Sequence, residues 1–385
     1  MRSAARMEGI APFHVMELMA RAHALEAQGR DIVHMEVGEP DFPTPEPIVA
    51  AAQRFLADGH VHYTSALGLP QLRDAIAGWY HMRYGIDVDP QRVVVTAGAS
   101  GALLLALGAL VTPGDEWLLT DPGYPCNRHF VRFCEGVPRL LPVAADTDYQ
   151  PTAAMIGAAW TTTTKGLLVA SPANPTGTLI DPAELTRLWQ AVDAQGGTLV
   201  VDEIYHGLTY GFDARTALEI SDEIVVINSF SKYFGMTGWR LGWLVVPQRM
   251  VRDIEKLAQN LYIAPSTPAQ HAALTAFAPE TVAILENRRD EFSKRRDLLL
   301  PGLRHLGFRI GAEPRGAFYI YADIGDLDKD SHALAGRLIE EAGVAATPGL
   351  DFGVSAPQRH MRFAYTVAAE KLEEGIARLA RLFGM

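Results

Sequence analysis

The chain has 385 residues, and its 34 Lys and Arg against 45 Asp and Glu give a formal net charge of −11 at pH 7. Apolar residues make up 48% and charged residues 21%, which is typical of a soluble globular protein with about two or three domains. The negative charge argues against a nucleic acid or an anionic membrane as the main partner, because both bind positive surfaces.

Cysteine content and apolar runs bear on the compartment. The two cysteines, Cys126 and Cys134, are too few for a disulfide framework or a zinc cluster and indicate free thiols in a reducing environment. Met1–Glu8 has two arginines but no apolar stretch after them, so we expect no signal peptide. The longest apolar run, Gly101–Val111, is too short to span a bilayer. We therefore expect a cytoplasmic protein with no membrane segment and no metal site.

In chain order, a proline-rich N-terminal arm is followed by alternating strand and helix patterns. A helix is expected after Asp181-Pro182, an N-cap followed by proline, and it should end at Gly196-Gly197. Continuous apolar strands separated by helices predict a mostly parallel seven-stranded sheet covered by helices on both faces, an α/β fold. The expected strands are Val93–Thr96, Trp117–Thr120, Arg139–Val143, Gly166–Ala170, Thr198–Asp202, Ile224–Asn228 and Gly242–Val246.

The pattern changes after about Pro279 to a smaller α+β segment. We expect a large domain of residues 46–279 and a small domain built from both chain ends, residues 1–45 and 280–385. The elements expected in the C-terminal part are helices at Glu280–His305, His332–Ala342 and Ala368–Phe383 and strands at Phe318–Tyr321 and Met361–Tyr365.

Chemistry-bearing residues follow several of the expected strands. Ligands of parallel sheets bind beyond the carboxyl ends of the strands. Small residues at Ala97–Gly101 open a helix and would let backbone N–H groups approach a phosphate, although such turns are common. Asn174 offers an amide at the same edge, in a segment that also reads as a simple tight loop.

Two charged residues follow the next strands. Asp202 ends an apolar strand, where a carboxylate needs a partner such as a cation, a helix N-terminus or a structural ion pair. Lys232 lies among small and aromatic residues, where a lowered pKa and Schiff-base chemistry become possible, and Arg240 follows. Each alone is better explained as a structural or exposed charge. A phosphorylated aldehyde with a cationic ring nitrogen, pyridoxal phosphate, would satisfy the whole set.

Three segments carry a resemblance to a known family. Ser229–Lys232 with Gly238–Gly242, Ser171–Gly177 and Asp202–Tyr205 occur in this order, and the resemblance extends from Gly38–Phe42 to His360–Phe363. The chain resembles the class I pyridoxal-phosphate aminotransferases of fold type I, the aspartate aminotransferase superfamily. The resemblance implies that pyridoxal 5′-phosphate is the cofactor, that amino acids and 2-oxo acids are the substrates, and that the protein is a homodimer.

The resemblance also assigns residues. It implies that Lys232 forms the Schiff base and moves the proton in a 1,3-shift, while Asp202 pairs with the pyridine N–H. Tyr205 and Asn174 would bond the phenolic oxygen of the cofactor, and Tyr124 would stack on its ring. Tyr63 would reach the phosphate bound in the neighbouring subunit. The remaining assignments are the phosphate ligands Ala99, Ser100, Ser229 and Arg240 and the substrate-carboxylate ligands Arg362, Asn174 and the backbone of Gly38.

Three rival activities are weighed against this expectation. A β-eliminating C–S lyase would use the same lysine and cofactor. A ligand-sensing regulator would need a DNA-binding segment before the arm. A nicotinamide dehydrogenase would need G-x-G-x-x-G after the first strand, and Gly98–Gly101 does not match this motif. Similar aspartate aminotransferases carry a lysine at the position of Ser100, so its absence puts aspartate in doubt. Phe13, Tyr262 and Phe318 either line a more apolar pocket or belong to the core.

Overall fold

The computed structural model describes residues 3–385. Its larger sheet has seven strands in the order β2-β8-β7-β6-β5-β3-β4, and only β8 runs antiparallel to its neighbours. All seven predicted strands are confirmed, with bounds that differ from the predicted ones by at most two residues. They are β2 Val93–Thr96, β3 Glu116–Asp121, β4 Val137–Pro142, β5 Thr164–Ala170, β6 Thr198–Asp202, β7 Val225–Ser229 and β8 Gly242–Val245.

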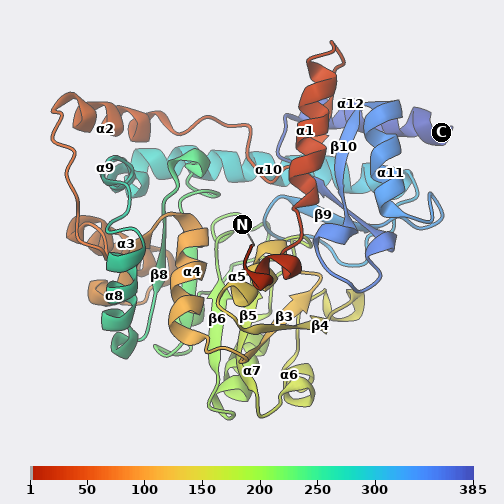
Figure 1. The fold of residues 1–385 in the computed structure, drawn as a ribbon. Coiled ribbons are helices and arrows are strands. Elements are labelled where there is room, and N and C mark those ends of the chain that lie inside the picture. The colour runs from red at the N-terminus through yellow and green to blue at the C-terminus, as the bar shows by residue number, and fades with distance from the viewer. Residues whose placement is uncertain (1–2) are drawn as a thin grey trace.

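Helices cover both faces of this sheet (Figure 1). Successive strand residues enter two separate cores: Val93 and Val95 pack on one face, and Val94 packs on the other. This burial on both sides explains why the strands are apolar throughout. The covering helices are α3 Pro70–Tyr84, α4 Gly98–Leu110, α5 Pro125–Phe133, α6 Ala153–Ala159, α7 Pro182–Asp193, α8 Val251–Leu261 and α9 Thr267–Ala273.

Local signals explain where α7 begins. The Asp181 carboxylate accepts hydrogen bonds from the backbone N–H groups of Ala183 and Glu184, and Pro182 occupies the first helical position. These contacts satisfy backbone donors that the helix itself leaves unpaired. The predicted N-cap is therefore confirmed.

A second sheet joins the two chain ends. Strand β1 (Val33–Met35) pairs in parallel with β10 (Val344–Pro348), and β11 (His360–Ala364) runs antiparallel between β10 and β9 (Tyr319–Asp323). β9 and β11 were predicted, whereas β1 and β10 were not. The helices around this sheet and in the arm are α1 His14–Glu26, α2 Glu46–Ala57, α10 Pro279–His305, α11 Ser331–Arg337 with a π-helical turn at Leu338–Ala342, and α12 Ala369–Phe383.

The arrangement of these helices bears on the predicted organisation. In Figure 1, α1 stands beside the second sheet, while α2 lies next to α9 of the larger part. The predicted helices at the C-terminal end are all present. The division at residues 45 and 279 stays a prediction. Within residues 3–385, no helix combines the length and the apolar character that crossing a membrane requires.

Candidate active site

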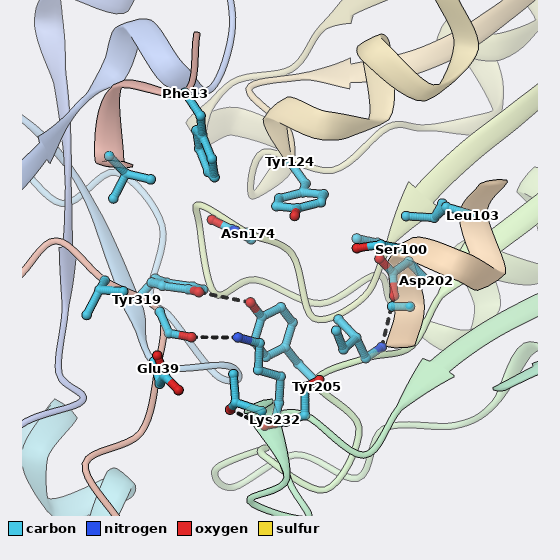
Figure 2. Close-up of a pocket in the computed structure, with 18 of the residues that line it drawn as sticks. Phe13, Glu39, Ser100, Leu103, Tyr124, Asn174, Asp202, Tyr205, Lys232 and Tyr319 are labelled. Carbon is cyan, nitrogen blue, oxygen red and sulfur yellow. Dashed lines mark hydrogen bonds between the residues drawn. The ribbon is translucent and has the colours of Figure 1, made fainter. Parts of the chain in front are cut away.

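A cavity of about 240 Å³ opens at the carboxyl ends of the parallel strands, between the two sheets (Figure 2). Ten of the twelve predicted site residues line it: Gly38, Ala99, Ser100, Tyr124, Asn174, Asp202, Tyr205, Lys232, Arg240 and Arg362. Ser229 is buried behind the wall and bonds to the hydroxyl group of Ser231, which does line the cavity. Tyr63 lies outside the cavity with 81% of its surface exposed.

Asp202 is a buried carboxylate at the end of β6. Its Oδ1 accepts the N–H of Ile204 at 3.1 Å, and among residues 3–385 no cationic side chain forms an ion pair with it. Burial raises the pKa of Asp202 to about 7, and the bond from Ile204 opposes that rise. A carboxylate held in this way is ready to receive a cation from the cavity.

Lys232 follows β7 and points its amino group toward the chain segment after β1. Its Nζ donates a hydrogen bond of 2.6 Å to the carbonyl of Gly38. Burial lowers the pKa of Lys232 to about 8, the Glu39 carboxylate opposes this, and the guanidinium groups of Arg362 and Arg240 add to it. The amino group is therefore partly neutral near neutral pH, which a nucleophile and proton carrier requires.

One end of the cavity is built for an anion. The helix α4 begins there at Gly98, and its first backbone N–H groups have no partner within the helix. Gly98 has φ +72°, and a Cβ at this position would lie 2.7 Å from Nη2 of Arg240. A Cβ on Gly242 would lie 2.7 Å from the carbonyl carbon of Gly98. The two glycines thus let the Arg240 guanidinium and strand β8 pack against the helix start.

The other end holds Arg362, which is 3% exposed and comes from β11. Its guanidinium stacks on the ring of Tyr319 at 4.3 Å and on that of Phe352 at 4.9 Å. Its Nη1 donates to Oδ1 of Asn174 at 2.9 Å, and its Nη2 donates to the carbonyl of Glu36. Within the described residues its Nε has no acceptor and no carboxylate pairs with it, so the cation is free to bind an anion.

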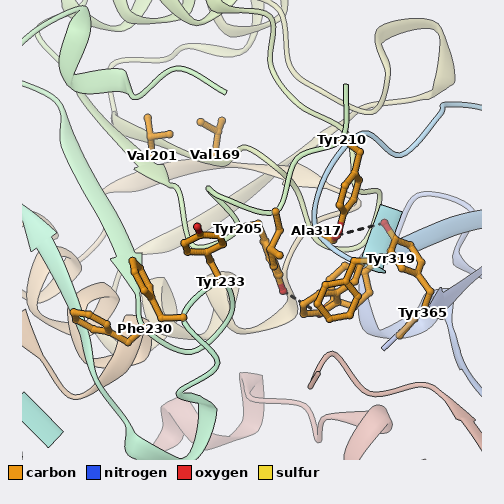
Figure 3. Packing of buried hydrophobic residues seen from close by; sticks show 14 of the residues in the cluster. Val169, Val201, Tyr205, Tyr210, Phe230, Tyr233, Ala317, Tyr319 and Tyr365 are labelled. Carbon is orange, nitrogen blue, oxygen red and sulfur yellow. Dashed lines mark hydrogen bonds between the residues drawn. The ribbon is translucent and has the colours of Figure 1, made fainter. Parts of the chain in front are cut away.

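Aromatic residues support the cavity floor. The hydroxyl groups of Tyr205 and Tyr319 lie 2.9 Å apart, and both rings belong to a buried aromatic cluster (Figure 3). A Cβ on Gly38 would overlap the Tyr319 hydroxyl group at 1.8 Å, so glycine is required there. Tyr124, half-buried, lines the cavity from the start of α5.

Much of the remaining wall is apolar, and most of that part comes from α4 and from the arm. Its larger apolar side chains are Phe13, Val15, Met16, Val37, Leu103 and Ile204, while Glu39 and Thr237 add polar groups. Of the three aromatic residues that the sequence left undecided, Phe13 lines the cavity. Phe318 is fully buried in the core, and Tyr262 packs against the core on the α4 side of the large sheet.

Sequence reasoning missed several residues of this site. Tyr319, Phe352 and Glu36 shape the surroundings of Arg362, but they lie far apart in sequence and meet only through the second sheet. The predicted strand at Phe318–Tyr321 offered one signal, because alternation places Phe318 and Tyr319 on opposite faces. Val15 and Met16 gave no signal, since apolar residues at the start of a helix usually face a core.

Comparison with known proteins identifies the family. Residues 30–379 match the model of the aminotransferases of class I and II. The chain belongs to this family, so it is an aminotransferase that uses pyridoxal 5′-phosphate and acts on amino acids and 2-oxo acids.

Its relatives cover nearly its whole length. A valine–pyruvate aminotransferase of Mycobacterium tuberculosis is 41% identical over 375 residues, 96% of each chain. An aspartate/prephenate aminotransferase of Thermus thermophilus is 34% identical over 382 residues, 98% of each chain. The crystal structure of an aminotransferase from Mycobacterium tuberculosis has a TM-score of 0.96 at 40% identity, and the match covers 100% of this chain and 99% of that one.

The cavity fits this cofactor in its chemistry. A phosphate would meet the start of α4 and Arg240, a cationic ring nitrogen would meet the unpaired Asp202, and an aldehyde would meet the amino group of Lys232. None of these three cofactor groups would occupy the buried Arg362, so its guanidinium is available to bind a second anion.

The unpaired Asp202 predicts a pH-dependent stability of the cofactor-free protein. Its folded pKa of about 7 lies above the unfolded value near 4, so the contribution of Asp202 to stability falls as pH rises from about 4 to 7 and then levels off. Asp202→Asn cannot ionise and should be more stable than the wild type at pH 8 by a few kcal/mol, since one pKa unit corresponds to about 1.4 kcal/mol. Urea unfolding of both proteins at pH 5 and pH 8 measures this. The exposed Asp193→Asn is the matched control, and a stability gain for Asp202→Asn that is equal at both pH values would contradict the prediction.

Proposed function

We propose that this aminotransferase takes its amino group from an amino acid with an aliphatic, uncharged side chain and passes it to a small 2-oxo acid. The observation that carries this proposal is the set of cations lining the cavity, which is limited among the described residues to Lys232, Arg240 and Arg362. Lys232 and Arg240 face the cofactor's functional groups in this proposal, and Arg362 takes the α-carboxylate. A donor with a second carboxylate would find no further cation, while Phe13, Met16 and Leu103 offer an apolar wall. The name of the valine–pyruvate relative agrees with this donor class.

The cofactor contacts follow from the same placement. Bound pyridoxal phosphate supplies an electron-accepting ring that stabilises negative charge on the substrate Cα. We assign its phosphate to Ala99, Ser100, Ser229 and Arg240, with Ser229 acting from behind the wall through Ser231. Tyr124 would cover the ring face, Asp202 would keep the ring nitrogen protonated, and Asn174 and Tyr205 would donate hydrogen bonds to the phenolic oxygen.

Lys232 is assigned the proton transfer. Its lowered pKa keeps a fraction of Nζ unprotonated at pH 7 to 8, so that it can remove the Cα proton and return it to the cofactor carbon. The carbonyl of Gly38, now 2.6 Å from Nζ, would hold the ammonium form between these transfers.

Arg362 is assigned the α-carboxylate. Its fork of N–H groups suits bidentate binding, and the Tyr319 and Phe352 rings keep the fork in one plane. Asn174, whose Oδ1 accepts a hydrogen bond from Nη1, would contact the carboxylate beside Arg362. The backbone of Gly38 also lines this part of the cavity.

Assembly and location stay proposals. We propose a homodimer in which the exposed Tyr63 reaches the phosphate in the neighbouring subunit. An 81% exposed aromatic ring next to the cofactor-binding part favours such a contact, because large apolar surfaces are costly to leave in water. We also propose that the protein acts in the cytoplasm, in keeping with its free thiols.

A panel of donors tests the proposed substrate class. The absorption of the bound cofactor should change to that of its amine form with valine, leucine and alanine at least about tenfold more efficiently than with aspartate, and pyruvate should reverse the change. A preference for aspartate or glutamate would contradict the proposal. Release of pyruvate and ammonia from cysteine-type substrates without an acceptor would instead support the lyase activity, which no feature of the site favours over transamination.

A further inference from the structure

The three residues after β1 hold several groups of the site through their backbone carbonyls. The carbonyl of Glu36 accepts hydrogen bonds from Nη2 of Arg362 and from the hydroxyl group of Thr347, the latter at 3.0 Å. The carbonyl of Gly38, two residues on, accepts Nζ of Lys232 at 2.6 Å. The carbonyl of Glu36 therefore helps to orient the guanidinium of Arg362, and the carbonyl of Gly38 makes a separate contact with the amino group of Lys232.

The side chain of Glu36 is an unusual feature of this segment. It is 0% exposed, its Oε1 lies 2.7 Å from Nδ1 of His34, and its Oε2 has no partner within residues 3–385. The other ring nitrogen of His34, Nε2, lies 3.1 Å from Oε1 of Glu26 at the end of α1. Removing the only charged partner of a buried carboxylate costs about 3–5 kcal/mol. His34 therefore stabilises the buried position of the Glu36 side chain.

We infer that Glu26, His34 and Glu36 form a chain of ionic contacts that positions Arg362 for the substrate carboxylate. His34, as a cation, holds the Glu36 side chain in the interior, and the Glu36 carbonyl then holds one arm of the guanidinium fork. His34 and Glu36 are positioning residues, since Arg362 and not they would touch the substrate. The inference rests on the proposed role of Arg362.

The charged surroundings of His34 support its cationic form. The hydrogen bond to Glu36 is the largest cause that raises the pKa of His34 to about 9, with Glu26 adding to it and burial opposing it. The His23 ring on α1 lies 6.0 Å from the His34 ring and is a further titratable group on that side.

β10, β11 and α12 also pack against β1. β10 carries no titratable side chain, and β11 carries His360 and Arg362. α12 packs on the opposite face through Gly375. Its charged side chains Lys371 and Arg378 bond to Asp31 and to Glu374 instead of reaching His34. Because its pKa is about 9, His34 carries a positive charge below that pH. Above pH 9 it loses its proton, Glu36 is left without a cation, and Arg362 should bind carboxylates more weakly.

Binding of an unreactive carboxylate tests this inference. Titration calorimetry of the cofactor-loaded enzyme with 3-methylbutanoate, from pH 7 to pH 10, reports the carboxylate site without turnover. His34→Gln should raise the Kd at pH 7.5 about tenfold or more. His34→Arg keeps a cation that does not titrate in this range, so its Kd should stay within about twofold of the wild type at pH 7.5 and should lack the weakening that the wild type shows above pH 9.

Two further variants separate the possible results. His81→Gln, whose ring pairs with Asp87 on the surface, should match the wild type throughout. Arg362→Lys should weaken binding at every pH. If Arg362→Lys binds as the wild type does, the proposed role of Arg362 fails. If Arg362 is required but His34→Gln binds normally, or His34→Arg keeps the wild-type weakening above pH 9, the positioning role alone is overturned.

Steady-state kinetics of His34→Gln distinguish a positioning role from a purely structural one. His34→Gln should raise the KM for the 2-oxo acid by about tenfold while kcat changes less than threefold, because Glu36 contacts Arg362, whereas Lys232 bonds to the Gly38 carbonyl. Loss of kcat with an unchanged KM would contradict the inference. Should His34→Gln fold poorly, the pH profile of His34→Arg still decides the matter.

Discussion

Lys232→Ala should lower turnover by about 10⁴-fold or more with every amino donor. No other amino group lines the cavity within the described residues, so nothing else can carry the proton between Cα and the cofactor. The side chain is partly buried and its Nζ makes a single hydrogen bond, to the Gly38 carbonyl, so its removal leaves no buried charge unpaired. The fold should therefore persist, and steady-state rates with circular dichroism measure both effects.

A lysine outside the site provides the control for this change. Lys165 is exposed on β5 and donates to the carbonyl of Thr162, so Lys165→Ala should keep wild-type rates. Addition of a small primary amine should restore part of the activity of Lys232→Ala but leave Lys165→Ala unchanged. Wild-type turnover in Lys232→Ala would remove the basis of the proposed mechanism.

Arg362→Lys should raise the KM for amino donors and for 2-oxo acids by about 100-fold, with a smaller change in kcat. A lysine keeps the charge, but it cannot present two parallel N–H groups to a carboxylate or stack on Tyr319 and Phe352. Losing one partner of a buried charged hydrogen bond costs about 2–5 kcal/mol, which corresponds to this range. Initial rates over a wide range of substrate concentration separate KM from kcat.

The control for Arg362→Lys is an arginine on the surface. Arg215 pairs with Glu219 four residues on and is half-exposed, so Arg215→Lys should leave both constants unchanged. An unchanged KM in Arg362→Lys would mean that the substrate carboxylate binds elsewhere. Equal loss of kcat in the two variants would point to a general defect of folding.

The larger sheet was predictable because its strands are buried on both faces. Each is a short apolar run such as Val93–Thr96, and helix signals such as Asp181-Pro182 separate them. Strands β1 and β10 were not predicted for a physical reason. β1 has three residues with polar His34 at its centre, and it exists because it pairs with β10, more than 300 residues away. Such pairing leaves no local pattern.

The site divides in a similar way. Residues at strand ends, such as Asp202 and Lys232, were predictable, because the topology of a parallel sheet brings these ends together. Arg362 reaches the cavity from the second sheet, and its direction depends on Tyr319, Phe352 and the Glu36 carbonyl. No spacing in the sequence encodes those contacts, so only the resemblance to the aminotransferases pointed to this residue.

The apolar wall was the least predictable part. Phe13 and Phe318 are both aromatic residues beside other apolar residues, but Phe13 lines the cavity whereas Phe318 is buried in the core. Their difference comes from the placement of the start of α1, where the Asp351 carboxylate accepts the backbone N–H groups of His14 and Val15 at 2.9 and 2.8 Å. That contact joins residues more than 330 positions apart.

The attachment point of the cofactor is the most direct measurement. Borohydride treatment of the loaded enzyme fixes the cofactor on whichever lysine carries it, and peptide mass mapping then identifies the modified residue. We expect one modified peptide containing Lys232 and unmodified peptides for the surface lysines Lys165 and Lys256. Modification of any other lysine with an unmodified Lys232 would contradict the account.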